Sequence, residues 1–78
     1  MNVIHEGWIT RNKAVMMGKP CIKGTRITVE LILEKLSQGA SVEWLLESYP
    51  HITKEDIFAC IDYARAIMKH EEVIELTA

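Results

Sequence analysis

The sequence predicts a mainly α fold, in which a short N-terminal β arm leads into a trihelical core of the helix-turn-helix type. Three observations support this prediction. Apolar residues recur at helical spacing in three stretches after residue 28. A capping residue precedes each stretch, and a glycine or a proline ends the first two. The residues before position 28 include β-branched, glycine and basic residues, a composition typical of an extended arm.

The stretch 18–29 reads Gly-Lys-Pro-Cys-Ile-Lys-Gly-Thr-Arg-Ile-Thr-Val and predicts a basic β-turn-β segment that feeds a helix. Gly18 and Gly24 can adopt positive φ at no steric cost, so each can turn the chain. Pro20 has no amide hydrogen and suits a turn or an edge strand. We expect extended segments at 3–5, 8–10 and 20–22, whereas 14–17 fits either a strand or one helical turn.

Three helices are expected at about 29–38, 42–48 and 54–69. Thr28 and Ser41 are the natural N-caps of the first two helices, and Gly39 ends the first. Pro50 stops the second helix, because the residue before a proline is driven out of helical space. Thr53 and Asp56 resemble a capping box for the third helix. The expected core comprises Leu33, Leu36, Leu45, Ile57 and Ile61.

The length of 78 residues predicts a single domain, with the arm at 1–27, the helical core at 28–70 and a tail at 71–78 that forms a strand or an acidic extension. Residues 1–28 carry five basic residues against one acid, a charge of +4. Residues 29–78 carry four basic residues against ten acids, a charge of −6. This asymmetry by itself favours a soluble surface with patchy charge, and the alternative is an acidic partner or nucleic acid.

Cys21 and Cys60 are far apart and form no metal-ligand motif with the three scattered histidines, so both are expected to be buried reduced thiols. No metal or cofactor site is predicted. The chain has no apolar run of about 18 residues and no signal-peptide pattern, and a cytoplasmic location with no membrane contact is expected. No base is placed to activate a hydroxyl nucleophile, and an enzyme is not expected.

The predicted second and third helices and their five-residue connector match a helix-turn-helix. In that arrangement Thr53, Lys54 and Phe58 face the major groove of DNA, and Lys19 and Lys23 on the arm meet phosphates. The alternative is a packing or protein-interaction module that binds no DNA. Two acids near the start of the third helix favour that alternative, because they repel phosphate.

The stretch 18–29 also resembles the motif GKP-x-I-[RK]-GTR-I-x-V of the domain of unknown function 433 family. Later elements of the family pattern follow in order at Gly39-Ala40-Ser41, Tyr49-Pro50, 53–57 and Tyr63-Ala64. The resemblance covers about residues 8–66. One departure is Asn12-Lys13, where the family often has Asp-Pro.

The resemblance implies a homeodomain-like helix-turn-helix and a homodimer. It also implies an antitoxin that binds operator DNA, represses its own operon and neutralises a PIN-type ribonuclease toxin. Within the motif, Gly18, Pro20, Gly24, Thr25 and Arg26 are expected to be structural. Arg26 is expected to hold the arm to the body through backbone carbonyls or an acid such as Glu30 or Asp62, and the competing reading places it on phosphate. The two short strands are expected to pair with a second copy across a two-fold axis, because a lone hairpin is marginal in water.

Overall fold

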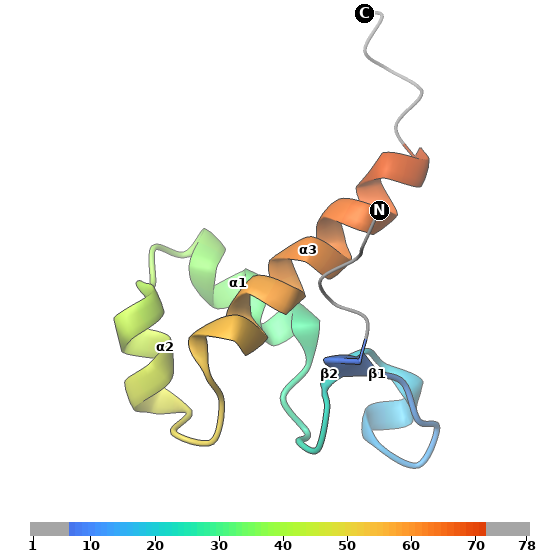
Figure 1. Cartoon of the computed structure of the whole chain (residues 1–78), viewed down its shortest axis with the longest axis horizontal. Coiled ribbons are helices and arrows are strands. Elements are labelled where there is room, and N and C mark those ends of the chain that lie inside the picture. Colours follow the sequence, from blue (N-terminus) through green and yellow to red (C-terminus); the bar gives the residue numbers. More distant parts are fainter. Residues whose placement is uncertain (1–6, 72–78) are drawn as a thin grey trace, which may run out of the picture.

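The computed structural model describes residues 7–71 and has three helices with a small sheet at one end (Figure 1). The order of elements is β1 (Ile9–Thr10), the short turn η1 (Met16–Gly18), β2 (Cys21–Ile22), α1 (Val29–Ser37), α2 (Val42–Ser48) and α3 (Lys54–Glu71). The predicted mainly α fold is therefore confirmed, and each helix begins at the predicted residue. The predicted segment at 3–5 and most of the predicted tail lie outside the described residues.

All three helix starts have the predicted caps. The Thr28 side chain accepts a hydrogen bond from the Leu31 amide, and the Ser41 side chain accepts one from the Trp44 amide, both at 3.0 Å. Gly39 follows α1 with φ of +98°, a conformation that glycine adopts without strain. These local bonds explain why the helix starts were predictable from single residues.

The two strands pair with each other in antiparallel register, with Ile9 opposite Ile22 and Thr10 opposite Cys21. Ile22 is buried in the core, and Ile9 packs against that core. The arm thus finds its pairing and its burial within its own chain. Pairing of this two-stranded sheet with a second copy across a two-fold axis stays a prediction.

The ambiguous stretch 14–17 forms a tight turn. The Asn12 carbonyl accepts from the Val15 amide at 2.8 Å, and the Asn12 side-chain oxygen accepts from the Ala14 amide at 2.8 Å. Asn12 thus closes the turn at the place where the family often has aspartate. Met16 and Met17 follow with positive φ of 49° and 58°, and Met17 is almost fully exposed.

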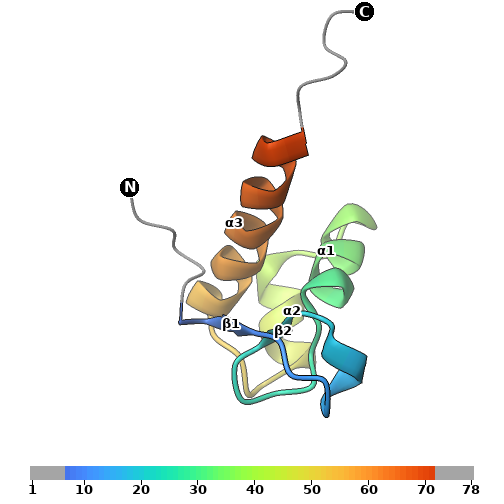
Figure 2. The same ribbon diagram turned by 90° about the vertical axis from the view of Figure 1, so that its right-hand side faces the viewer.

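A single core joins the arm to all three helices. Its buried members are Ile22, Val29, Ile32, Leu45, Ile52, Ile57 and Cys60. Of the predicted core residues, Leu45 and Ile57 are completely buried, and Leu33 and Leu36 pack against the cluster. Figure 2 shows α1 and α3 side by side above the strands.

Ile61 was predicted to be buried, and this prediction is wrong, because its side chain is 43% exposed. A helix turns about 100° per residue, so Ile61 lies about 40° beyond Ile57 on the side away from Cys60. The buried arc of α3 runs in the other direction, from Ile57 through Cys60 to the half-buried Tyr63 and the fully buried Ala59. Helical spacing alone did not show on which side of Ile57 the buried face continues.

Candidate nucleic-acid interface

The start of α3 is held by a reciprocal capping box. The Asp56 amide donates to the Thr53 hydroxyl oxygen at 3.1 Å, and the Thr53 amide donates to the Asp56 carboxylate at 2.9 Å. The predicted capping box is therefore confirmed, with aspartate in place of the usual glutamate or glutamine. The Thr53 hydroxyl keeps its own hydrogen as a donor, and its side chain is exposed.

One face of α3 presents a mixture of basic and aromatic side chains to solvent. Four exposed side chains of α3 fall within an arc of about 60° at 100° per residue. They are Lys54, Phe58, Arg65 and Lys69. Phe58 is 47% exposed, a high value for a large aromatic side chain. The Arg65 guanidinium donates to Asp62 at 3.0 Å, which neutralises part of the charge on this face, and Glu55 remains exposed beside it.

The described part of the arm, residues 7–27, contains five basic residues and no acid. Arg11 donates through Nε to the Gly18 carbonyl at 3.1 Å, a contact that closes the turn at 12–18. The Lys19 ammonium lies 3.6 Å from the Glu30 carboxylate on α1, and both side chains are well exposed. Lys23 is exposed, and its side chain has no partner among residues 7–71. Of the two lysines predicted to contact phosphate, Lys23 is therefore the one whose ammonium group is not shared with a carboxylate among residues 7–71.

The turn between β2 and α1 is built around Gly24 and Thr25. Gly24 has φ of +80°, and no atom lies within 4 Å of the Cβ that another residue would place there. Thr25 donates from both its amide and its hydroxyl to the Ile22 carbonyl, at 3.0 and 2.9 Å. The Thr25 hydroxyl oxygen also accepts from the Ile27 amide at 3.0 Å. The structural roles expected for Gly24 and Thr25 thus have a direct explanation in the turn.

Arg26 makes none of the contacts that were expected to hold the arm to the body. Its side chain is exposed, and within the described residues it makes no hydrogen bond or ion pair with a carbonyl, Glu30 or Asp62. The three hydrogen bonds of Thr25 hold this turn without the guanidinium. The arginine that does fix a backbone carbonyl is Arg11, which the sequence interpretation did not single out.

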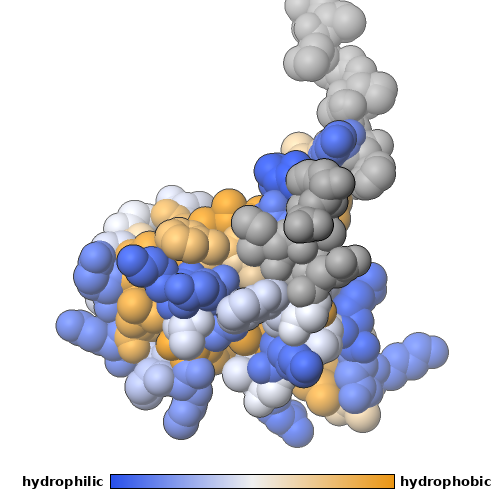
Figure 3. All heavy atoms as spheres, in the orientation of Figure 1, coloured by the Kyte–Doolittle hydropathy of each residue, from blue (hydrophilic) through white to orange (hydrophobic). Residues whose placement is uncertain are grey.

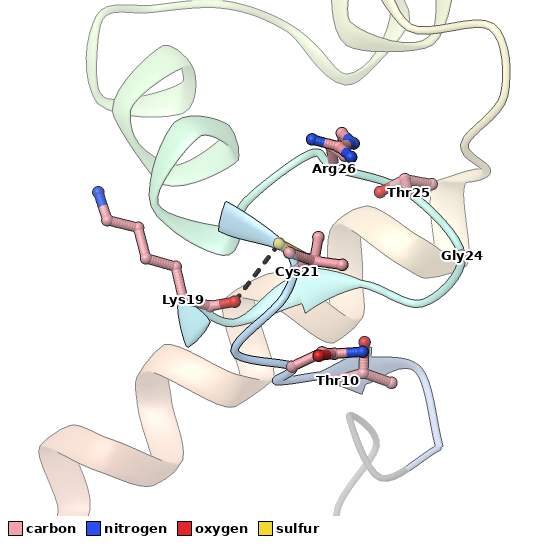
Figure 4. A pocket seen from close by; sticks show the side chains of 8 residues that line it. Thr10, Lys19, Cys21, Gly24, Thr25 and Arg26 are labelled. Carbon is pink, nitrogen blue, oxygen red and sulfur yellow. Dashed lines mark hydrogen bonds between the residues drawn. The ribbon is translucent and has the colours of Figure 1, made fainter. Parts of the chain in front are cut away.

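Arg26 lies instead at the edge of a hollow of about 390 Å³ on the arm. The arm hollow is lined by Thr10, Asn12, Val15, Lys19, Cys21, Gly24, Thr25 and Arg26. Figure 4 shows that the lining residues come from β1, from the segment before β2, from β2 itself and from the turn after it, with the Cys21 thiol bonded to the Lys19 carbonyl at 3.4 Å. One hint of this site is readable from strand alternation, because Thr10 must face away from the core if Ile9 faces into it.

A second and more apolar depression, of about 590 Å³, lies between α1 and the C-terminal half of α3. This α1–α3 groove is lined by Lys19, Pro20, Thr28, Val29, Glu30, Leu33, Glu34, Ser37, Tyr63, Ala64 and Ile67. With 18 residues against nine, α3 is the longer helix, and its end extends past α1 (Figure 1). On the face seen in Figure 3, hydrophobic residues gather over the helices and hydrophilic residues cover most of the arm.

Cys21 and Cys60 are buried and unpaired, as expected from the sequence. Burial, with a further contribution from the Asp56 carboxylate, raises the pKa of the Cys60 thiol from 9.0 to about 12. Among residues 7–71, no group of three histidine, cysteine or acidic side chains is placed to hold a metal ion. No helix in the same range is long and apolar enough to cross a bilayer.

Comparison with known proteins gives three consistent matches. The model of the family described as "Protein of unknown function (DUF433)" matches residues 9–64. A protein of Sinorhizobium fredii, "Uncharacterized protein y4eO", is 33% identical over 58 residues. That match covers 74% of this chain and 26% of the relative, so the chain spans about a quarter of the relative's length.

The crystal structure of a DUF433 member protein from Anabaena variabilis superposes with a TM-score of 0.75 at 32% identity. The match covers 81% of this chain and 62% of the other. The region matched by the family model contains both strands, the Gly24–Thr25 turn, α1, α2 and the part of α3 up to residue 64. By sequence and by fold, the chain belongs to the DUF433 family.

Proposed function

We propose that this chain is a DNA-binding, antitoxin-like transcriptional regulator that represses its own operon and neutralises a PIN-type ribonuclease toxin. The observation that carries the proposal is the placement of two segments. The basic turn at 23–27 and the connector at 49–53, which leads into α3, lie at the same end of the molecule in both Figure 1 and Figure 2. A basic turn beside the start of a solvent-facing helix supplies both kinds of contact that operator binding requires.

The two segments have different roles in this proposal. Lys23 neutralises a backbone phosphate, which adds affinity without reading sequence. The Thr53 hydroxyl, Lys54 and Phe58 meet base edges and thymine methyl groups as α3 enters the major groove. Glu55 opposes binding through its charge and contributes selectivity where it accepts a hydrogen bond from a cytosine amino group.

The test is a fluorescence anisotropy titration of the full chain with a duplex from its own upstream region, at several salt concentrations. We expect Lys23→Ala to weaken binding and to lower the slope of log K against log salt by about 0.9, the value for one lost phosphate contact. We expect Lys54→Ala to weaken binding to the upstream duplex more than binding to a scrambled duplex. Lys69→Ala is the matched control, since it removes the same charge about 22 Å further along α3.

Failure of the wild-type chain to bind the upstream duplex above its binding to the scrambled one contradicts the regulatory part of the proposal. A change with Lys69→Ala equal to that with Lys23→Ala contradicts the assignment of the interface. Direct neutralisation is tested separately, by mixing the chain with a PIN-type nuclease encoded beside it and measuring ribonuclease activity.

The second candidate is a protein-interaction module that binds its partner without contacting DNA. It is favoured by the exposed apolar side chains of α3, which include Phe58, Ile61, Ile67 and Met68. Under this candidate the chain inhibits the neighbouring nuclease but binds the upstream and scrambled duplexes equally weakly. The same two experiments therefore separate the candidates.

We propose further that the active form is a homodimer, with a second copy in the α1–α3 groove. Ile67 lines this groove and is itself 43% exposed, so a two-fold axis places the same apolar surface on both sides of the interface. The rim carries Lys19 together with Glu30 and Glu34, so the same axis can set unlike charges against each other. A dimer presents two copies of α3 to two half-sites of an operator.

A further inference from the structure

We propose that the arm hollow is a phosphate-binding subsite, in which Arg26 is the principal ligand-binding residue. The proposal rests on the DNA-binding function proposed above and assigns to it one contact, a phosphate of the duplex backbone. The argument comes from the donors and acceptors that line the hollow. Its test also includes a readout that does not depend on DNA.

Two of the side-chain acceptors that line the hollow, on Asn12 and Thr25, are already occupied, whereas several donors are free. The Asn12 side-chain oxygen accepts from the Ala14 amide, so its amino group remains available to a ligand. The Thr25 hydroxyl both donates and accepts within the turn, so it is saturated. The Thr10 hydroxyl lines the hollow and has no hydrogen-bond partner among the described residues.

The charges around the hollow favour an anion. Lys19 and Arg26 line it, and none of its lining residues is acidic. The Lys19 ammonium is shared with Glu30 at 3.6 Å, whereas the Arg26 guanidinium has no partner within residues 7–71. Figure 4 shows Lys19 and Thr10 on different sides of the hollow from Thr25 and Arg26. An exposed guanidinium with no protein partner can give two parallel hydrogen bonds to one phosphate.

The turn beside Arg26 adds backbone donors. The amides of Gly24 and Arg26 make no hydrogen bond within the described residues, although the amides of Thr25 and Ile27 on either side do. The two free amides alternate with bonded ones, and Gly24 has φ of +80°. The Arg26 guanidinium, the Asn12 amino group and the Thr10 hydroxyl are therefore the main donors that the hollow offers to a phosphate group.

The first experiment follows the amide resonances of the 15N-labelled full chain during titration with inorganic phosphate, at constant ionic strength maintained with chloride. We expect saturable shifts confined to Thr10, Asn12 and residues 23–27. Arg26→Gln should abolish these shifts, and Lys69→Gln, the control with the same charge change, should retain them. Arg26→Gln should leave the melting temperature unchanged, because the side chain is exposed and unpartnered.

The second experiment measures the salt dependence of binding to the upstream and scrambled duplexes. We expect Arg26→Gln to weaken binding to both duplexes by the same factor, because a phosphate contact carries no sequence information. The slope of log K against log salt should fall by about 0.9, the value for one lost phosphate contact. Arg26→Lys should restore the slope but only part of the affinity, because lysine lacks the planar fork.

The outcomes separate this inference from the function it rests on. If phosphate shifts depend on Arg26 and the wild-type chain binds no duplex, the hollow takes a free phosphate ligand, and the proposed function fails while the subsite stands. If the wild-type chain binds the upstream duplex and Arg26→Gln changes neither the salt slope nor the phosphate shifts, the subsite is overturned and the function stands. A fall in melting temperature with Arg26→Gln also overturns the subsite, because it returns Arg26 to a structural role.

Discussion

Leu45 lies at the centre of the core, where it is completely buried. Leu45→Ala removes an isopropyl group from the core cluster, which also contains residues of α1 and α3, and leaves a cavity. We expect the free energy of unfolding to fall by about 2–5 kcal/mol, measured by chemical denaturation. Leu46→Ala, at a half-buried position on the same helix, should cost less. Equal losses at the two positions contradict the packing described here.

Cys60 predicts a pH dependence of stability. The pKa of its thiol in the folded chain is raised to about 12 from 9.0. The folded state therefore holds the thiol proton more tightly than the unfolded state does. This contribution to stability is fully present below pH 9 and is lost as the pH rises towards 12. Between these values it falls by up to about 1.4 kcal/mol per pH unit.

The matching measurement compares unfolding free energies of the wild-type chain and Cys60→Ala from pH 8 to pH 10.5. The variant is less stable at pH 8, because it loses packing, but its stability should fall less steeply above pH 9. Parallel curves for the two proteins contradict the raised pKa. Thiol-specific reagents should also react with Cys60 only after the chain unfolds, because the protonated buried thiol is unreactive.

At the scale of the single element, the capping box fixes the start of α3, which is the helix proposed to enter the major groove. Thr53→Ala removes the acceptor of the Asp56 amide, and we expect stability to fall by about 1 kcal/mol. Thr53→Ser keeps the hydroxyl, so its free energy of unfolding should lie within a few tenths of a kcal/mol of that of the wild-type chain. Thermal melting of the three proteins is sufficient for this comparison. If serine fails to restore stability, the methyl group of Thr53, rather than its hydroxyl, supports the helix start.

At the scale of the whole molecule, the α1–α3 groove and the exposed Ile67 on the longer helix α3 predict that two copies of the chain associate. Sedimentation at micromolar concentration should give a dimer, and Ile67→Asp should give a monomer. Ile61→Asp is a matched control, because both isoleucines are 43% exposed on α3 but only Ile67 lines the groove. Dissociation by Ile61→Asp but not by Ile67→Asp would place the interface on the opposite face of α3. A monomeric wild-type chain rules out the dimer.

Features of the structure were predictable from the sequence when the interaction that determines them joins residues close together in the chain. The three helix starts were predictable because each cap involves residues three apart, as between Thr28 and Leu31. Ile61 was misplaced because its burial depends on how far α3 is covered by the arm and the other helices. The contacts expected of Arg26 are not made, because Thr25 supplies the hydrogen bonds that close the turn. The arm hollow was missed because its lining comes from three segments brought together by the β1–β2 pairing.

The bonds between β2 and the start of α1 also determine where the chain can change in length. The Ile22 amide bonds to the Ile27 carbonyl and the Val29 amide to the Pro20 carbonyl, both at 2.9 Å, so the two ends of the intervening turn are tied together. A residue inserted between Lys23 and Gly24 moves Thr25 out of register with the Ile22 carbonyl and breaks the two hydrogen bonds that close the turn. A residue inserted between Ile27 and Thr28 lengthens the segment between the two ties, so both can no longer form with α1 in its present position. Natural insertions and deletions should therefore be absent from 22–29.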